Sequence, residues 1–215
     1  MRILRLMILC WSLLPLTACD KGYQYAPLPS TANVLILGDS LTYGTGAAEG
    51  QDYPTLLASK TGWNVINAGV PGNTSQQGLE RLSDYLEAHA SGEAKIDLLM
   101  IELGGNDFLK RVPEAQLVEN LRSILQQAKY HGIQTALIAI PELSPIGAAF
   151  GNLSDHPLYA QLAQETNTPL LSEIFTEVLS KNSLKADPIH PNAEGYKVVT
   201  ERLQQSLQTL GFVRR

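Results

Sequence analysis

Two nearly continuous apolar runs most strongly limit how this chain of 215 residues can fold. They cover Leu98–Leu103 and Thr135–Ile140. Strands without polar alternation are typical of parallel sheets, because helices cover both faces of such a sheet. Three shorter β-rich segments are also expected to form strands: Val34–Leu37, Asn64–Asn67 and Pro169–Leu171. The chain is therefore predicted to build a mostly parallel sheet of five strands.

Helical patterns lie between these strands. An apolar stripe with helical spacing follows Pro113 and ends before Gly132; its members are Leu117, Leu121, Ile124, Leu125 and Ala128. Two further stripes comprise Leu79, Leu82 and Leu86, and then Tyr196, Val199, Leu203, Leu207 and Leu210, the last opened by Asn192 as a cap. This alternation predicts a three-layer α/β/α sandwich of the flavodoxin-like type. Ligands of such folds bind beyond the carboxyl ends of the strands.

The N-terminus has the layout of an export signal. Arg2 and Arg5 precede an apolar run over residues 6–14, followed by Leu16-Thr17-Ala18-Cys19. The run is too short to span the ~30 Å hydrocarbon core of a bilayer comfortably. The four residues ending at Cys19 resemble a bacterial lipobox, in which the cysteine is lipidated. We therefore expect a signal peptide over 1–18, lipidated Cys19 with a tether over 19–32, and one domain over 33–215. Ordinary cleavage to a soluble periplasmic protein is the alternative.

The charge, the cysteine and histidine content and the missing motifs argue against nucleic-acid partners, disulfides, metals and nucleotide cofactors. After residue 18 the chain holds 14 basic and 21 acidic side chains, so phosphate backbones of nucleic acids are poor partners. Cys10 would leave with the signal, so no intramolecular disulfide is expected. The four His residues are scattered, which predicts no metal site, and no dinucleotide or phosphate-binding motif predicts a cofactor.

Glycine, asparagine and aspartate gather where the predicted strands end. The first strand leads into Gly38-Asp39-Ser40-Leu41, the second into Gly69-Val70-Pro71-Gly72-Asn73, and the third into Gly104-Gly105-Asn106-Asp107; Asp187-Pro188-Ile189-His190 precedes the last helix. Together they supply a nucleophile, a base, an acid and oxyanion donors, which are the parts that acyl transfer needs. The short spacing from Asp187 to His190 lets the carboxylate reach the imidazole Nδ1.

These four blocks, in this order, resemble the SGNH or GDSL hydrolase superfamily. The stretches 72–78 and 103–107 are similar to its bacterial thioesterase/lysophospholipase and arylesterase branch. The resemblance implies that Ser40 is the nucleophile, His190 the general base and Asp187 the orienting acid. It also implies an oxyanion hole formed by the backbone N–H groups of Ser40 and Gly72 and the side-chain amide of Asn106.

Each of these residues also has a purely structural reading. Ser40 could cap a helix, Asn106 could cap a turn, and Gly72 could be an ordinary turn glycine. Asp39 and Asp107 are expected to accept hydrogen bonds from backbone N–H groups of their own turns, with Asp107 as the rival for the triad acid. The combined set favours catalysis.

The loops around the predicted triad carry apolar residues suited to an acyl or aryl group. The expected pocket contains Leu41, Phe108, Leu109, Pro141, Leu143, Ile146 and Ile189. We therefore expect hydrolysis of short-acyl or aryl esters, with thioesters or lysophospholipids as further candidates. A carbohydrate O-acetyl esterase or transacylase, and a non-catalytic interaction lipoprotein, are the alternatives. The expected location is the cell envelope, facing the periplasm, with a small-molecule ester as partner and the membrane reached through Cys19.

Overall fold

A single parallel sheet forms the centre of the molecule. The structure is a computed structural model that describes residues 25–142 and 153–214. Its strands are β1 (Asn33–Gly38), β2 (Asn64–Gly69), β3 (Leu98–Glu102), β4 (Gln134–Ile138) and β5 (Leu170–Leu171). Their order is β2-β1-β3-β4-β5, and each neighbouring pair is parallel. The five parallel strands confirm the predicted flavodoxin-like sheet, and the order is the one usual for that fold.

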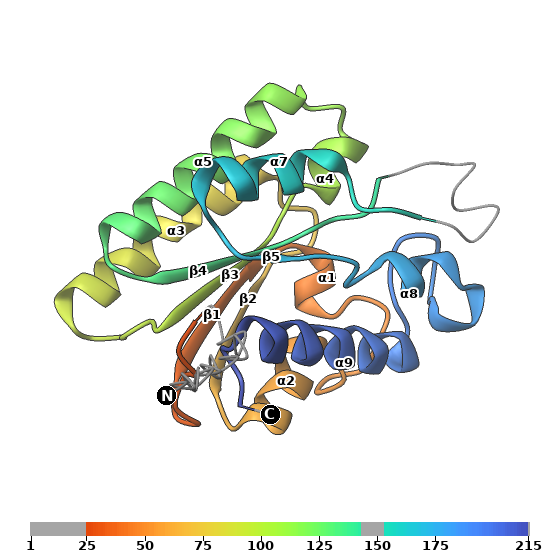
Figure 1. Cartoon of the computed structure of the whole chain (residues 1–215). Helices are drawn as coiled ribbons and strands as arrows, with labels where there is room; N and C mark the ends of the chain where they lie inside the picture. Colours follow the sequence, from red (N-terminus) through yellow and green to blue (C-terminus); the bar gives the residue numbers. More distant parts are fainter. Residues whose placement is uncertain (1–24, 143–152, 215) are drawn as a thin grey trace, which may run out of the picture.

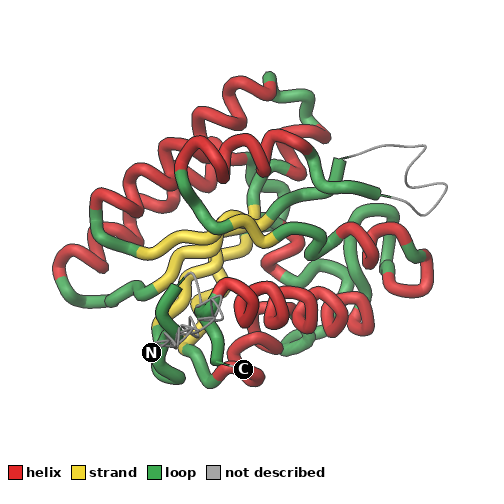
Figure 2. The backbone as a smooth tube through the Cα atoms, viewed as in Figure 1, coloured by secondary structure: helices red, strands yellow, loops and turns green. Residues whose placement is uncertain are grey.

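Helices cover both faces of the sheet, which makes the three predicted layers (Figures 1 and 2). One layer contains α3 (Ser75–Ser91), α5 (Glu114–Tyr130) and α7 (Pro157–Thr166). The other contains α2 (Tyr53–Thr61) and α9 (Ala193–Leu210). Short helices α1 (Ser40–Tyr43), α4 (Gly105–Leu109) and α8 (Thr176–Ser180), with a 3₁₀ turn at Asn182–Leu184, lie in the connections.

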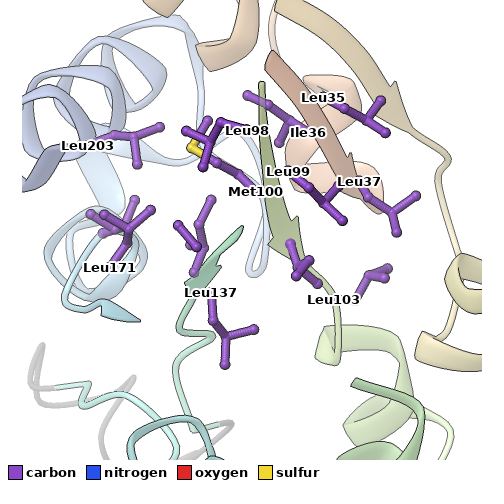
Figure 3. Close-up of a cluster of buried hydrophobic side chains, with 14 of the residues drawn as sticks. Leu35, Ile36, Leu37, Leu98, Leu99, Met100, Leu103, Leu137, Leu171 and Leu203 are labelled. Atoms are coloured by element: carbon purple, nitrogen blue, oxygen red, sulfur yellow. The ribbon is translucent and has the colours of Figure 1, made fainter. Parts of the chain in front are cut away.

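The core lies on both faces of β1 and β3. Their apolar side chains are buried, and Figure 3 shows Leu35, Leu99 and Leu137 among the packed residues. Burial on both faces is the reason that these strands read as continuous apolar runs. The predicted third strand is one residue too long: β3 ends at Glu102, and Leu103 belongs to the following loop.

Side-chain caps begin the helices that lead away from the candidate site. Thr74 accepts from the backbone N–H of Gln77, whose side chain accepts in return from the N–H of Thr74, and this capping box starts α3. Asn192 accepts from the N–H of Gly195 and starts α9, as predicted. Both caps place the beginning of a long helix beside a loop that carries a predicted catalytic group.

The segment before β1 packs on the domain over its described part. The Tyr25 ring stacks on Phe212 at 4.7 Å between centroids, and the backbone N–H of Leu28 donates to Phe212 O at 2.9 Å. Residues 25–32 were expected to belong to a tether, so the packed structure begins earlier than the predicted boundary at residue 33. The expected signal peptide, Cys19, Leu143 and Ile146 lie outside the described residues. Within the described ranges, no helix is long and apolar enough to cross a membrane.

Candidate active site

Ser40, His190 and Asp187 form one hydrogen-bonded chain. Ser40 is the first residue of α1, two residues after the end of β1, and its Oγ lies 2.9 Å from His190 Nε2. His190 Nδ1 lies 2.7 Å from Asp187 Oδ2. Because an ionised carboxylate can only accept, Nδ1 carries the proton and Nε2 is free to accept from the serine hydroxyl. Ser40 does not cap α1, since that position is taken by Asp39.

The loop before α9 fixes the position of the acid and the imidazole. Asp187 Oδ1 accepts from the backbone N–H groups of Ile189 and His190, each at 2.9 Å. Burial alone would raise the pKa of Asp187, but its hydrogen bonds from His190 and Ile189 lower it below the ordinary value. Asp187 therefore stays ionised at neutral pH. The loop after α1 lies close against this His190 loop at Gly46, whose φ is +99°. A Cβ at this position would meet Pro191 O at 2.3 Å, so the close approach requires glycine.

Asp39 connects the turn that carries Ser40 to Asn106. It accepts from the N–H of Leu41 at 3.0 Å, and its other oxygen accepts from Asn106 Nδ2 at 2.8 Å. The bond to Leu41 is the local backbone contact predicted for Asp39, whereas the bond to Asn106 was not foreseen. Burial raises the pKa of Asp39 to about 6, and the bonds from Leu41 and Asn106 partly oppose that rise. Asn106 does not cap its helix through its side chain, because Gly104 occupies that position.

The Asp107 carboxylate is bonded to Ser75, whereas His190 is bonded to Asp187. Asp107 accepts from the backbone N–H of Ser75 at 2.8 Å and from Ser75 Oγ at 2.6 Å. The expectation that Asp107 bonds its own turn is therefore wrong, because the partner belongs to the first turn of α3. Asp107 is buried and used by Ser75, and the carboxylate bonded to His190 is that of Asp187. The function of Asp107 in this geometry is to join α3 to α4.

A buried glutamate holds the helix α1 that begins at Ser40. Glu102, at the end of β3, accepts at Oε2 from Thr42 N (3.1 Å) and Thr42 Oγ1 (2.6 Å). Thr42 Oγ1 also lies 2.7 Å from Tyr53 Oη. Burial, and then the nearby charge of Asp39, hold the pKa of Glu102 well above its usual range. The sequence reading missed Glu102, although a glutamate within an otherwise apolar strand was a signal.

A small cavity of about 50 Å³ lies beside Ser40. Its apolar lining consists of Leu41, Leu109, Ile140, Pro141, Leu179 and Ile189. Of the predicted pocket residues, Phe108 is not in this lining, because its ring stacks on His156 at 4.7 Å between centroids. A larger cavity of about 650 Å³ lies near Gln134 and Pro169 and contains none of the predicted site residues. Within residues 25–142 and 153–214, no group of three or more potential ligand side chains could hold a metal ion.

Comparison with known proteins gives a consistent set of relatives. Residues 36–198 match the GDSL-like Lipase/Acylhydrolase family. The chain is 35% identical over 182 residues to thioesterase 1/protease 1/lysophospholipase L1 of Escherichia coli K12, covering 82% of this chain and 84% of that protein. It is 27% identical over 184 residues to an arylesterase of Vibrio mimicus, covering 83% and 89%.

A solved structure agrees with these relatives. The psychrotrophic esterase EstA from Pseudoalteromonas, in a structure inhibited by monoethylphosphonate, superposes with a TM-score of 0.69 at 26% identity, covering 82% of this chain and 96% of that one.

Proposed function

The chain belongs to the GDSL-like lipase and acylhydrolase family, and from this premise we propose that it hydrolyses short-acyl or aryl carboxylic esters through an acyl-enzyme on Ser40. Its relatives are esterases and a thioesterase/lysophospholipase, so it is a hydrolase of ester bonds. The observation that carries the mechanism is the hydrogen-bonded chain from Ser40 through His190 to Asp187. The order of bonds is the one that a serine nucleophile requires.

In the first half-reaction, Ser40 Oγ attacks the ester carbonyl carbon while its proton passes to His190 Nε2. Asp187 stabilises the imidazolium that forms, since its oxygen accepts from Nδ1. The tetrahedral intermediate then collapses, the proton on Nε2 goes to the leaving alkoxide or phenoxide, and the alcohol departs. In the second half-reaction, a water gives its proton to Nε2 and attacks the acyl-enzyme, which releases the acid and restores Ser40.

The oxyanion formed in both half-reactions needs donors that are already in place. Our proposal gives this role to the N–H groups of Ser40 and Gly72 and to the amide of Asn106. An amide nitrogen has two hydrogens, so the bond from Asn106 to Asp39 leaves one hydrogen for the oxyanion. Because an ionised carboxylate only accepts, Asp39 holds Nδ2 of Asn106, not its oxygen, toward the nucleophile turn.

The cavity beside Ser40 supports a small acyl group. A volume of about 50 Å³ is several times the ~10–15 Å³ of cavity space that one water molecule needs, so the cavity has room for a few non-hydrogen atoms. An acyl chain of a few carbons fits this space, and its lining by Leu41, Leu179 and Ile189 is apolar. We test this with p-nitrophenyl esters of two to twelve carbons, beside Ser40→Ala as the blank. The expected optimum of kcat/KM lies at two to four carbons, whereas an optimum at eight or more would overturn the assignment.

We further propose that Cys19 is lipidated and that the protein is held in the cell envelope, facing the periplasm. The packed domain reaches back to Tyr25, so the connection from Cys19 spans at most about 20 Å. Tyr25 bonds to Leu210 at the far end of α9, a helix about 27 Å long whose other end begins near His190. An anchored enzyme would then open its site away from the bilayer, which favours soluble esters over lysophospholipids of the same membrane.

Mass spectrometry of the mature N-terminus tests the anchor. A diacylated N-terminal Cys19, absent from Cys19→Ala, is the expected result. An unmodified N-terminus beginning at another residue would contradict it.

A further inference from the structure

The turn that carries Gly72 is largely exposed, with little packing around Gly72 itself. We call residues 70–73 the Gly72 turn; it is closed by a bond from the N–H of Asn73 to Val70 O at 3.1 Å. Gly72 is exposed, its φ is +80°, and a Cβ there would meet no atom within 4 Å. Packing therefore does little to fix its N–H. Polar contacts must do so, if this N–H is to serve as an oxyanion donor.

One such contact comes from beneath, through Arg81 of α3. Its Nε donates to Asn73 Oδ1 at 2.8 Å, and its two terminal nitrogens donate to Ala68 O and Gly38 O, each at 3.2 Å. Ala68 lies at the end of β2, and Gly38 stands two residues before Ser40. Arg81 is half-buried, and it ties the foot of the Gly72 turn to the strand that presents the nucleophile.

The second contact comes from the side, through Lys110. Its Nζ donates to Gly72 O at 2.7 Å. Its backbone N–H donates to Asn106 O at 2.9 Å, so its main chain belongs to the same helical turn as Asn106. Through their backbone carbonyls, Lys110 thus joins two of the three residues that supply the groups assigned to the oxyanion hole.

We propose that Lys110 is a positioning residue, which holds the Gly72 turn at the distance from Asn106 that the oxyanion requires. The inference rests on the proposed function. A misplacement of about 1 Å can lower a rate on the order of 10²-fold. Removal of the exposed bond from Lys110 to Gly72 O should displace the Gly72 turn only part of the time. The fall in kcat should therefore be smaller than about 10²-fold. The lysine would not contact the substrate, and KM for a neutral ester should change little.

A surface lysine beside an active site has a competing use, which is to bind an anionic part of the substrate. The two uses differ for a neutral substrate such as p-nitrophenyl acetate. A lysine that recognises an anion gives no change in kcat for this ester. A lysine that positions the Gly72 turn lowers kcat for every ester, since the oxyanion is common to all of them.

The test is Lys110→Met in the full chain, with p-nitrophenyl acetate as substrate. Methionine keeps the apolar stem and removes the donor. We expect kcat to fall roughly 3- to 30-fold with KM within twofold of wild type. Lys110→Arg should recover most of kcat, because a guanidinium can also reach Gly72 O. Lys95→Met is the matched control. Lys95 is also exposed and pairs with Asp97, but it precedes β3 and so lies at the amino ends of the strands, away from the site. The kcat of Lys95→Met should equal that of wild type.

Hydrogen–deuterium exchange of residues 68–74 provides a second readout that does not depend on turnover. Exchange should be faster in Lys110→Met than in wild type, and Lys110→Arg should restore it. Unchanged kcat together with unchanged exchange would overturn the inference, and so would a change confined to KM. Failure of the proposed function has a different signature: the wild type would then neither hydrolyse the ester nor react at Ser40.

Discussion

Replacing Asp39 by Asn should stabilise the folded protein at neutral pH and slow ester hydrolysis at the same time. Asp39 is buried, and burial raises the pKa of its carboxyl to about 6, against 3.8 for the free group. A carboxyl with a raised pKa in the folded state binds its proton more tightly there than in the unfolded chain. The ionised form therefore destabilises the fold, and the stability of the wild type should fall as the pH rises from about 4 to 6.

The size of this effect follows from the two pKa values. A difference of about two corresponds to a destabilisation of about 3 kcal/mol once both states are ionised. Asparagine has no charge to desolvate, but its single amide oxygen can take the place of only one of the two carboxylate oxygens that accept from Leu41 and Asn106, and the lost bond costs about 1–2 kcal/mol. We therefore expect Asp39→Asn to gain about 1–2 kcal/mol at pH 7.5 and to lose a similar amount near pH 4.

Catalysis should move in the opposite direction. With one acceptor oxygen left for both Leu41 and Asn106, the Asn106 amide is oriented less firmly, and kcat should fall about 10- to 100-fold, short of the loss expected when the donor itself is removed. The measurements are urea unfolding at pH 4.5 and 7.5, and kcat for p-nitrophenyl acetate at pH 7.5. Asp84→Asn, the same change at an exposed position of α3, should alter neither quantity. An equal difference in unfolding free energy at both pH values would refute the reasoning about Asp39.

Two further substitutions test the proposed oxyanion donor and the close packing between β2 and α1. Asn106→Ala should lower kcat for p-nitrophenyl acetate by about 10²–10³-fold; a loss below tenfold would remove Asn106 from the oxyanion hole. Gly69→Ala should lower the free energy of unfolding by about 1–3 kcal/mol, or the Tm by several degrees, because its Cβ would meet the backbone nitrogen of Tyr43 at 2.2 Å. An unfolding free energy within about 0.5 kcal/mol of wild type, the usual range for a neutral surface substitution, would contradict this steric argument.

Much of the fold and the site could be predicted from local signals. The apolar runs identified the buried strands, and the residues that follow β1 and β3 do lie at one edge of the sheet beside the loop of His190. The two-residue spacing between Asp187 and His190 was enough to expect their contact, because it depends only on a short loop. Their roles in catalysis stay predictions that the experiments above address.

The features that the sequence did not reveal depend on contacts between distant segments. Glu102 lies under a turn 60 residues away in the chain, and periodicity cannot tell which backbone it meets. Tyr25 belongs to a segment without periodicity, so its stacking on Phe212 at the far end of the chain could not be foreseen. Phe108 has the right position for the pocket, but its ring packs on His156 instead. Side-chain direction in a loop is set by such tertiary partners.

Covalent labelling of Ser40 tests the central claim most directly. The protein is incubated with an alkyl fluorophosphonate, and intact mass spectrometry with peptide mapping locates the adduct. The predicted result is a single adduct on Ser40 of the wild type. Ser40→Ala should show neither the adduct nor ester turnover. Labelling at another residue, or turnover that persists in Ser40→Ala, would contradict the account.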